Sequence, residues 1–291
     1  MEIAMTNLTI TPIKPTIGAV IVGVDLNNLT EEILAKIKQA LLDHQVIFFR
    51  DQDLQTEAQV KLARSFGSLH IHPVFPTVPN IPEVIVLDSH ATDLRDNELW
   101  HTDVTFSKTP PLGCVLRAVK IPSSGGDTLW ASGTAAFEAL DDDIKQKIQG
   151  LTAIHDIRLS FPEERFGGVS DEEKARLEEI YRKNPSVPHP VVRTHPDTGK
   201  PILFVSEGFT SHIEGFSEDE SRALLDFLTE YAVKEEFHLR WQWREGDVAI
   251  WDNRCTQHKA MFDYGDAHRI MHRATVNGDE PYYKSYTSSA A

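Results

Sequence analysis

The segment Trp100-His101-Thr102-Asp103 places a histidine and an aspartate two positions apart. On an extended chain alternate side chains share a face, so His101 and Asp103 would project together while Thr102 points away. One imidazole and one carboxylate are two of the three ligands of a 2-His-1-carboxylate facial triad, which leaves the other positions on Fe(II) open. The same pair is also typical of a strand-end histidine that is hydrogen-bonded to a neighbour, so a third ligand is needed.

A second segment, from Gly246 to His258, predicts a buried strand that ends in an Asp-Asn turn and delivers His258. Arg269 and Arg273 follow on a predicted strand, where a separation of four residues puts both on one face with Met271 between them. Buried arginines are costly unless each meets an anion. Carboxylates of the chain are one possible set of partners. The functional alternative is a bidentate clamp on a carboxylate of 2-oxoglutarate and a second contact with an anionic substrate.

Helix starts along the chain are marked by capping residues. Apolar spacing between Ile33 and Leu42, after Thr30, predicts an amphipathic helix that leads into a strand at 46–49. Three capping boxes predict further helices. They are Thr56 with Gln59, for a helix ending near Gly67, Ser170 with Glu173, for 171–183, and Ser217 with Glu220, for 218–233. A further helix is expected over 134–149.

Short β-type runs occupy most of the remaining chain. They cover 84–87, 99–106, 113–119, 128–131, 191–194, 202–205, 237–243, 248–251 and 269–275. These runs lack the regular alternation of strand and helix that a parallel sheet requires, so an antiparallel sandwich or barrel with helical insertions is predicted. Because there is neither a repeat nor a long linker, residues 1–291 are expected to form a single domain.

The composition narrows the classes of partner. With 44 acidic and 29 basic residues, the formal net charge of −15 would repel a phosphate backbone, so nucleic acid is not expected. No run approaches the roughly 18 apolar residues of a membrane span. The N-terminus shows no secretory signal, and a cytoplasmic location is expected. The two cysteines, Cys114 and Cys255, suit a reducing compartment and are expected to be small buried side chains.

Beyond these patterns, residues 8–283 resemble the family of taurine and 2-oxoglutarate-dependent Fe(II) dioxygenases. The similarity is densest in LHIHPVFP, WHTDVTF, SGGDTLWASG, HPVVRTHP, EGFT, AIWDNR and RIMHRAT. The resemblance implies a mainly β fold with flanking helices around a double-stranded β-helix, or jelly roll. It also implies an enzyme that uses Fe(II), 2-oxoglutarate and O₂ to hydroxylate taurine or a related alkylsulfonate next to the sulfonate. Sulfite, succinate and CO₂ would be released.

The resemblance also implies residue roles. Its catalytic iron ligands are His101, Asp103 and His258, and its ligands for the C5 carboxylate of 2-oxoglutarate are Thr128 and Arg269. The substrate residues it implies are His72 and Arg273 on the sulfonate, with Asp96, Asn97, Val104, Ser160, Phe161 and Phe209 around them. Phe75 departs from the family pattern, which has a sulfonate-binding tyrosine there, so the preferred sulfonate is left open.

Two other classes of protein remain possible at the level of sequence. A zinc hydrolase could use the same three ligands but would have no use for a carboxylate clamp. A non-catalytic jelly-roll sensor of iron or an oxoacid would keep the clamp without turnover. Within the enzyme class, an alkyl sulfate ester is the alternative substrate. The expected partners are a small anionic sulfonate and further copies of the chain in a homo-oligomer, without nucleic acid or membrane.

Overall fold

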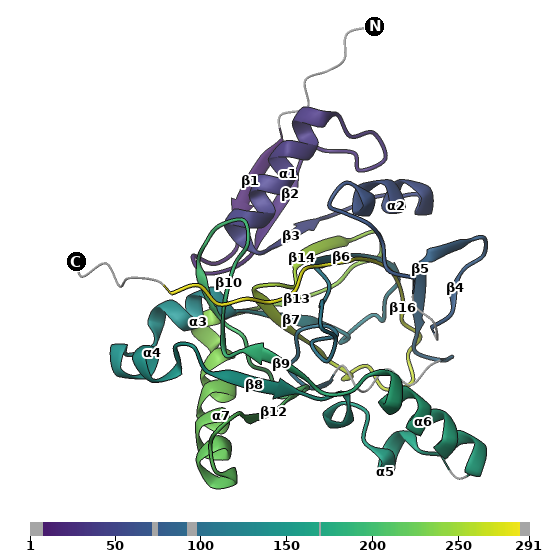
Figure 1. The fold of residues 1–291 in the computed structure, drawn as a ribbon. Coiled ribbons are helices and arrows are strands. Elements are labelled where there is room, and N and C mark those ends of the chain that lie inside the picture. Colours follow the sequence, from purple (N-terminus) through teal and green to yellow (C-terminus); the bar gives the residue numbers. More distant parts are fainter. Residues whose placement is uncertain (1–7, 72–74, 92–97, 169, 286–291) are drawn as a thin grey trace, which may run out of the picture.

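The computed structural model describes residues 8–71, 75–91, 98–168 and 170–285. Strands occupy the centre of the molecule and helices lie around them (Figure 1). The largest sheet has the order β1-β2-β3-β14-β6-β16-β5-β4. Its strands are β1 (Thr9–Pro12), β2 (Ala19–Val22), β3 (Val46–Phe49), β4 (Thr77–Val78), β5 (Ile81–Asp88), β6 (Gly113–Lys120), β14 (Val248–Asp252) and β16 (Ile270–Val276). Strands β2 and β3 run parallel, and the other pairs are antiparallel.

A second sheet packs against this one and carries part of the site. It consists of β7 (Thr128–Ser132) between β13 (His238–Trp241) and β15 (Thr256–Ala260). Aromatic side chains fill the space between the two sheets. Phe48 of β3 stacks on Trp241 of β13 with ring centroids 3.9 Å apart, and it meets Trp130 of β7 edge-on at 5.4 Å. This apolar layer brings β14 and β16 of one sheet close to β7 and β13 of the other.

Helices cover both outer sides of the strands. The helices α1 (Glu31–His44) and α2 (Thr56–Arg64) pack on the largest sheet through apolar side chains. On the other side α3 (Gly133–Ala139), α4 (Asp142–Ile148) and α7 (Glu218–Ala232) share a core with the smaller strands. Those strands are β8 (Thr152–His155), β9 (Val187–Pro190), β10 (Val192–Thr194), β11 (Pro201–Leu203) and β12 (Thr210–Ile213). The short helix α5 (Glu163–Phe166) and α6 (Asp171–Lys183) lie together at the lower right of Figure 1.

Most of the predicted elements are present. The hydroxyl of Thr30 caps α1 by accepting a hydrogen bond from the main-chain N–H of Ile33. Both serine capping boxes form at the starts of α6 and α7. The predicted runs at 84–87, 113–119, 128–131, 248–251 and 269–275 lie in or overlap β5, β6, β7, β14 and β16. Among the described residues, no helix is long and apolar enough to cross a membrane.

Two helix predictions are wrong in detail. The expected helix at 134–149 is two helices, because Leu140 adopts an extended conformation, with ψ 147°, and buries its side chain in the core shared with α7. Three aspartates in a row from Asp141 then favour a new helix start. The box at Thr56 does not form, since Gln55 occupies the cap position of α2. Gln59 is instead fully buried and donates to the carbonyls of Val115 and His272.

The predicted strand at 99–106 is also wrong. Only His101 forms a β-bridge, to His258, and the chain turns from Asp103 onward. Val104 has φ +54°, a left-handed conformation that is strained for a β-branched residue. The cause of this turn lies outside residues 99–106. The side chain of Asn253, which is distant in sequence, forms hydrogen bonds with the main chain of Asp103.

Candidate metal centre and co-substrate pocket

His101, Asp103 and His258 form a compact buried group between the two facing sheets. The Nε2 atoms of His101 and His258 lie 3.8 and 3.7 Å from Oδ1 of Asp103. The ligand atoms of all three residues lie within 4.8 Å of one another, and the residues are 4%, 5% and 6% exposed. The structure therefore brings together the residues that the sequence pattern singled out. Two imidazoles and one carboxylate facing a common point are a donor set that fits Fe(II).

The protonation states of the group suit metal binding. Burial lowers the pKa of His101 and lowers that of His258 to about 3, so both imidazoles are neutral at neutral pH. Burial opposes ionisation of Asp103, but the Arg273 guanidinium holds its pKa below the usual range. Nδ1 of His101 lies 2.7 Å from the carbonyl oxygen of Leu99, which places its proton there and leaves Nε2 able to ligate.

The side chain of Asn253 holds the main chain of Asp103. Its Oδ1 accepts from the N–H of Asp103 at 2.9 Å, and its Nδ2 donates to the carbonyl of Asp103 at 3.1 Å. Nδ2 also donates to the carbonyl of Pro111 at 3.1 Å, and Asn253 is fully buried. This clasp fixes Asp103 just before the left-handed Val104. Asn253 lies in the AIWDNR segment that carries part of the resemblance, but the resemblance implied no role for it.

A second set of bonds ties the two histidine segments together. The main chains of His101 and His258 exchange hydrogen bonds of 3.1 and 2.8 Å. The hydroxyl of Thr102 donates to the carbonyl of Thr256 at 2.9 Å. These bonds fix the position of His258, on β15, relative to the irregular segment around His101.

A cavity of about 50 Å³ lies beside His258. It is lined by Leu87, Leu116, Thr128, Trp130, Trp251, His258, Ala260, Phe262, Arg269, Met271 and Arg273. The Nε atom of Arg269 is buried and has no hydrogen-bond partner among the described residues. Burial lowers the pKa of Arg269, because the charged guanidinium is poorly solvated in this position. An anion in the cavity would offset that cost.

Thr128 and Trp243 define a second polar contact in the same cavity. The indole N–H of Trp243 donates to the hydroxyl oxygen of Thr128 at 3.0 Å. With that lone pair engaged, the Thr128 hydroxyl is set to donate its own proton to an acceptor. Trp243 was not among the residues that the sequence pattern singled out. Thr128 and Arg269, which the resemblance paired, do line one cavity.

The main chain around Arg269 is held from β5. Ser89 and Arg269 exchange two hydrogen bonds of 3.0 Å, one from each main-chain N–H.

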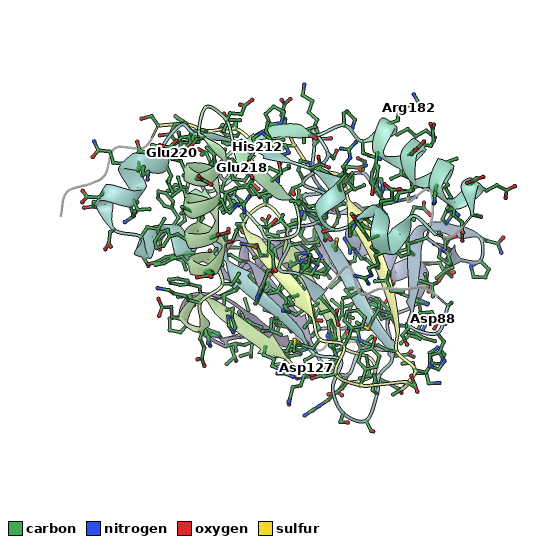
Figure 2. All side chains as sticks on the ribbon, turned by 90° about the horizontal axis from the view of Figure 1, so that it is seen from below. Asp88, Asp127, Arg182, His212, Glu218 and Glu220 are labelled. Atoms are coloured by element: carbon green, nitrogen blue, oxygen red, sulfur yellow. The ribbon has the colours of Figure 1, made fainter. Side chains whose placement is uncertain are left out.

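Asp127, the neighbour of Thr128, is buried but paired with Arg240 at 2.6 Å. Its charge still opposes the lowering of the pKa of Arg269 by burial, but no ion pair joins the two side chains among the described residues. Figure 2 places Asp127 and Asp88, which precedes Ser89, on the same lower side of the molecule, away from the labelled residues of α6 and α7.

Arg273 lines the cavity together with Arg269 and Met271, so the predicted common face is confirmed. Nη2 of Arg273 donates to Oδ2 of Asp103 at 2.6 Å. Asp103 therefore has one oxygen toward the histidines and the other toward a guanidinium. Burial opposes the charge of Arg273, but Asp103 raises its pKa above the ordinary value, so the guanidinium stays charged.

Three other residues of the expected substrate pocket lie near the metal-binding group. Phe209 meets the ring of His101 nearly edge-on, with centroids 6.2 Å apart. Val104 follows Asp103 and is half-buried. Ser160 is buried, and its hydroxyl donates to the carbonyl of Gly208 at 2.7 Å, so it serves the wall of the site.

The remaining expected substrate residues are less closely placed. Phe161 is half-buried and packs on Phe166 of α5, with ring centroids 5.1 Å apart. Phe75 is half-buried. Neither of these, nor Val104, Ser160 or Phe209, lines the cavity beside Arg269. His72, Asp96 and Asn97 lie outside the described residues.

A second group with metal-binding side chains, His195, Asp252 and Cys255, is a structural network instead. Nδ1 of His195 accepts from the main-chain N–H of Asp197 at 3.2 Å, so its proton is on Nε2, which donates to Asp252 at 3.0 Å. Arg254 donates to both oxygens of the same carboxylate, at 2.9 and 2.6 Å. A carboxylate engaged in this way has no capacity for a metal, and the network instead steadies the turn that leads to His258.

Comparison with known proteins agrees with this geometry. The family described as "Taurine catabolism dioxygenase TauD, TfdA family" matches residues 9–275. An alkylsulfatase from Acinetobacter baylyi is 40% identical over 270 residues, which is 90% of this chain and 83% of that protein. An alpha-ketoglutarate-dependent sulfate ester dioxygenase from Pseudomonas putida is 38% identical over 280 residues, 94% of this chain and 91% of that one. A taurine dioxygenase structure from Burkholderia xenovorans superposes with a TM-score of 0.79 at 36% identity, covering 94% and 92% of the chains.

The fold and the site define a 2-oxoglutarate-dependent dioxygenase that uses Fe(II) and O₂. The chain belongs to the TauD and TfdA family. The expected fold class, mainly β with flanking helices around a jelly-roll core, is confirmed. A zinc hydrolase, kept open from the sequence, is not supported.

Proposed function

We propose that His101, Asp103 and His258 hold Fe(II), and that Arg269 and Thr128 bind the distal carboxylate of 2-oxoglutarate. Support comes from the compact donor set and from the adjacent cavity. The single observation that carries the proposal is the buried Arg269 guanidinium beside this cavity, whose Nε lacks a partner among the described residues. A dicarboxylate offers it a planar, two-oxygen acceptor.

When bound, Fe(II) with 2-oxoglutarate supplies the oxidation, in which one O₂ atom enters succinate, released with CO₂, and the other enters the substrate. The chain supplies placement. Asp103 and the neutral histidines hold the metal, and Arg269 with Thr128 fixes the far end of the co-substrate. Trp130 and Trp251 give the cavity an aromatic wall.

For the substrate we propose an alkyl sulfate ester, oxidised at the carbon that bears the sulfate. Arg273 is the cation available to the anionic group, and relatives at 40% and 38% identity are named as an alkylsulfatase and a sulfate ester dioxygenase. Hydroxylation of that carbon gives an adduct in which the bond between the carbon and the sulfate oxygen breaks. The hydroxyl proton is lost, an aldehyde forms, and inorganic sulfate leaves with the bonding electrons.

Taurine or a related alkylsulfonate is the second candidate, favoured by the similarity to a taurine dioxygenase structure. Here the C–S bond would break and sulfite would leave. The two candidates therefore differ in the sulfur oxyanion that they release.

A matched panel tests the substrate. Hexyl sulfate, hexanesulfonate and taurine are each incubated with Fe(II), 2-oxoglutarate and O₂, and succinate, sulfate and sulfite are quantified. We expect succinate and sulfate in equal amounts from hexyl sulfate, above any sulfite from the other two. Sulfite from taurine as the dominant product would assign the second candidate. Succinate formation that none of the three stimulates would contradict both.

The variant Phe75→Tyr examines the same question from the protein side. It restores a hydroxyl donor, and one added hydrogen bond is worth about 0.5–1.5 kcal/mol, or roughly two- to tenfold in affinity. We expect the KM for taurine to fall by that factor while the KM for 2-oxoglutarate is unchanged. If both Michaelis constants stay at the wild-type values, Phe75 does not face the sulfur oxyanion.

A further inference from the structure

A cluster of three side chains lies behind Asp103, on the side away from the histidines. Nε of Arg273 donates to Sγ of Cys114 at 3.2 Å and to Oγ1 of Thr275 at 3.3 Å. Sγ of Cys114 lies 3.5 Å from Oγ1 of Thr275 and 3.7 Å from Oδ2 of Asp103. Cys114 is 1% exposed on β6, and Thr275 belongs to the neighbouring strand β16. The Cys114 thiol therefore contacts both members of the Asp103–Arg273 ion pair and the hydroxyl of Thr275.

These contacts fix the plane of the Arg273 guanidinium. Nε is held by Cys114 and Thr275, and Nη2 is held by Asp103 at 2.6 Å. Among the described residues, Nη1 shows no hydrogen bond, and the guanidinium carbon lies 5.5 Å from the centroid of the Trp251 ring, in the wall of the cavity. One edge of the guanidinium thus holds the metal-binding carboxylate and another is available to the cavity.

We propose that Cys114 is a positioning residue for Arg273, and that the Asp103–Arg273 pair makes metal binding and anion binding mutually dependent. This inference rests on the proposed function, because the anion is taken to be the sulfur oxyanion of the substrate. Cys114 acts through Arg273 and touches neither metal nor substrate.

The sign of the dependence follows from charge. A guanidinium that is bonded to Asp103 repels a cation held by the other oxygen of the same carboxylate. An anion on the free edge of Arg273 offsets that repulsion, so it should tighten metal binding, and by reciprocity the metal should tighten anion binding. The effect requires Arg273 to be held in one plane. Without the thiol, Nε keeps only Thr275, and the guanidinium gains freedom to rotate away from Asp103.

A binding experiment tests this without turnover. Mn(II) is titrated into metal-free protein, without 2-oxoglutarate, in sodium sulfate or in sodium chloride of equal ionic strength, and free Mn(II) is measured by electron paramagnetic resonance. Sulfate should lower the Mn(II) dissociation constant of the wild type by about fivefold or more, the usual lower range for coupled sites. In Cys114→Ala the sulfate effect should shrink by about twofold or more, toward no effect, because one hydrogen bond that orients Arg273 is lost.

Two further variants separate positioning from packing. Cys114→Ser keeps an acceptor for Nε and should retain most of the sulfate effect, whereas Cys114→Val fills the space without a good acceptor and should behave like Cys114→Ala. Cys255→Ala is the matched control, since it removes a buried thiol that donates to the carbonyl of Asp252. It should keep the full effect. Circular dichroism confirms that each variant is folded, and Cys114→Val replaces Cys114→Ala if the latter is not.

The outcomes are distinct from those of the substrate panel. A wild type whose Mn(II) affinity is the same in sulfate and chloride would overturn the mutual dependence, even if hexyl sulfate is oxidised. A full sulfate effect in both Cys114→Ala and Cys114→Val would overturn the role of Cys114. Failure of the proposed function would appear instead as missing succinate and sulfate in the panel, with the Mn(II) result unchanged.

Discussion

Arg269 differs from the other buried arginines in its surroundings. Arg254 is paired with Asp252, Arg273 with Asp103, and Arg193 with Asp279. The buried carboxylate of Asp127, next to Thr128 in the chain, is paired with Arg240. Among the described residues, Arg269 forms no ion pair, and the planar fork of its guanidinium suits a carboxylate such as that of the proposed co-substrate.

Replacing Arg269 by Lys keeps the charge but removes the two-donor geometry. A charge-assisted hydrogen bond is worth about 1.5–3 kcal/mol, so the dissociation constant of 2-oxoglutarate should rise roughly ten- to a hundredfold. Calorimetric titration with Mn(II) present measures it, and Arg158→Lys, on an exposed arginine bonded to Asp156, is the control. Unchanged affinity in Arg269→Lys would remove this residue from the co-substrate site.

At the scale of elements, the site depends on contacts between segments that are distant in sequence. His101 and Asp103 were expected to share a face because they alternate on a strand, and they do come together. The strand itself is absent, and the cause is Asn253, whose side chain satisfies both main-chain groups of Asp103. Local propensity in residues 99–106 carries no information about this partner, so the metal-binding pair could be predicted and its backbone could not.

The fold shows the same division between local and distant information. Capping boxes at Ser170 and Ser217 are local devices and were predicted correctly. Gln59 has the sequence spacing of a capping box but is used as a buried donor to two strands. The break at Leu140 is likewise set by burial against α7 and its neighbours, which periodicity within 134–149 does not contain.

The Asn253 clasp yields a prediction for Asn253→Ala. The variant leaves the buried N–H of Asp103 and the carbonyl of Pro111 without their partner, which should cost about 1–3 kcal/mol of unfolding free energy. Metal affinity should fall roughly 10- to 100-fold, as for other residues that orient a ligand. Urea unfolding and Mn(II) titration measure the two effects. The control is Asn277→Ala, whose exposed side chain bonds only Ser68 among the described contacts. Wild-type Mn(II) affinity in Asn253→Ala would show that the clasp does not orient Asp103.

At the scale of the whole molecule, a strongly acidic protein maintains a cationic cavity. The formal net charge is −15, yet the described charged side chains that line the cavity are Arg269 and Arg273. Burial between two sheets makes this possible, because charges in a poorly solvated site act on a ligand far more strongly than solvated charges on the surface.

The same burial makes stability depend on pH. Burial lowers the pKa of His101, His155 and His258, and His258 falls to about 3. These groups stay neutral in the folded state while their unfolded counterparts take up protons below about pH 6.5. The contribution of these neutral histidines to the unfolding free energy of the metal-free protein should therefore be complete above about pH 6.5. It should fall as pH decreases from there, by about 1.4 kcal/mol per pH unit for each such histidine.

Urea unfolding at a series of pH values checks this dependence. In His155→Gln the slope below about pH 6.5 should be smaller by about one histidine's share, 1.4 kcal/mol per pH unit. His212→Gln, at an exposed histidine on β12, should keep the wild-type slope. Equal slopes in the wild type and His155→Gln would contradict the assignment of the acid sensitivity to buried neutral histidines.

The central claim is that 2-oxoglutarate has two anchors in one cavity, a metal held by His101, Asp103 and His258, and the guanidinium of Arg269. Anaerobic calorimetric titration of 2-oxoglutarate, with and without Fe(II), into the wild type and His258→Ala tests it most directly. We predict tight binding to the wild type that depends on Fe(II), and weak binding to folded His258→Ala that Fe(II) does not improve. Equally tight, Fe(II)-dependent binding to His258→Ala would contradict the assignment of the metal site.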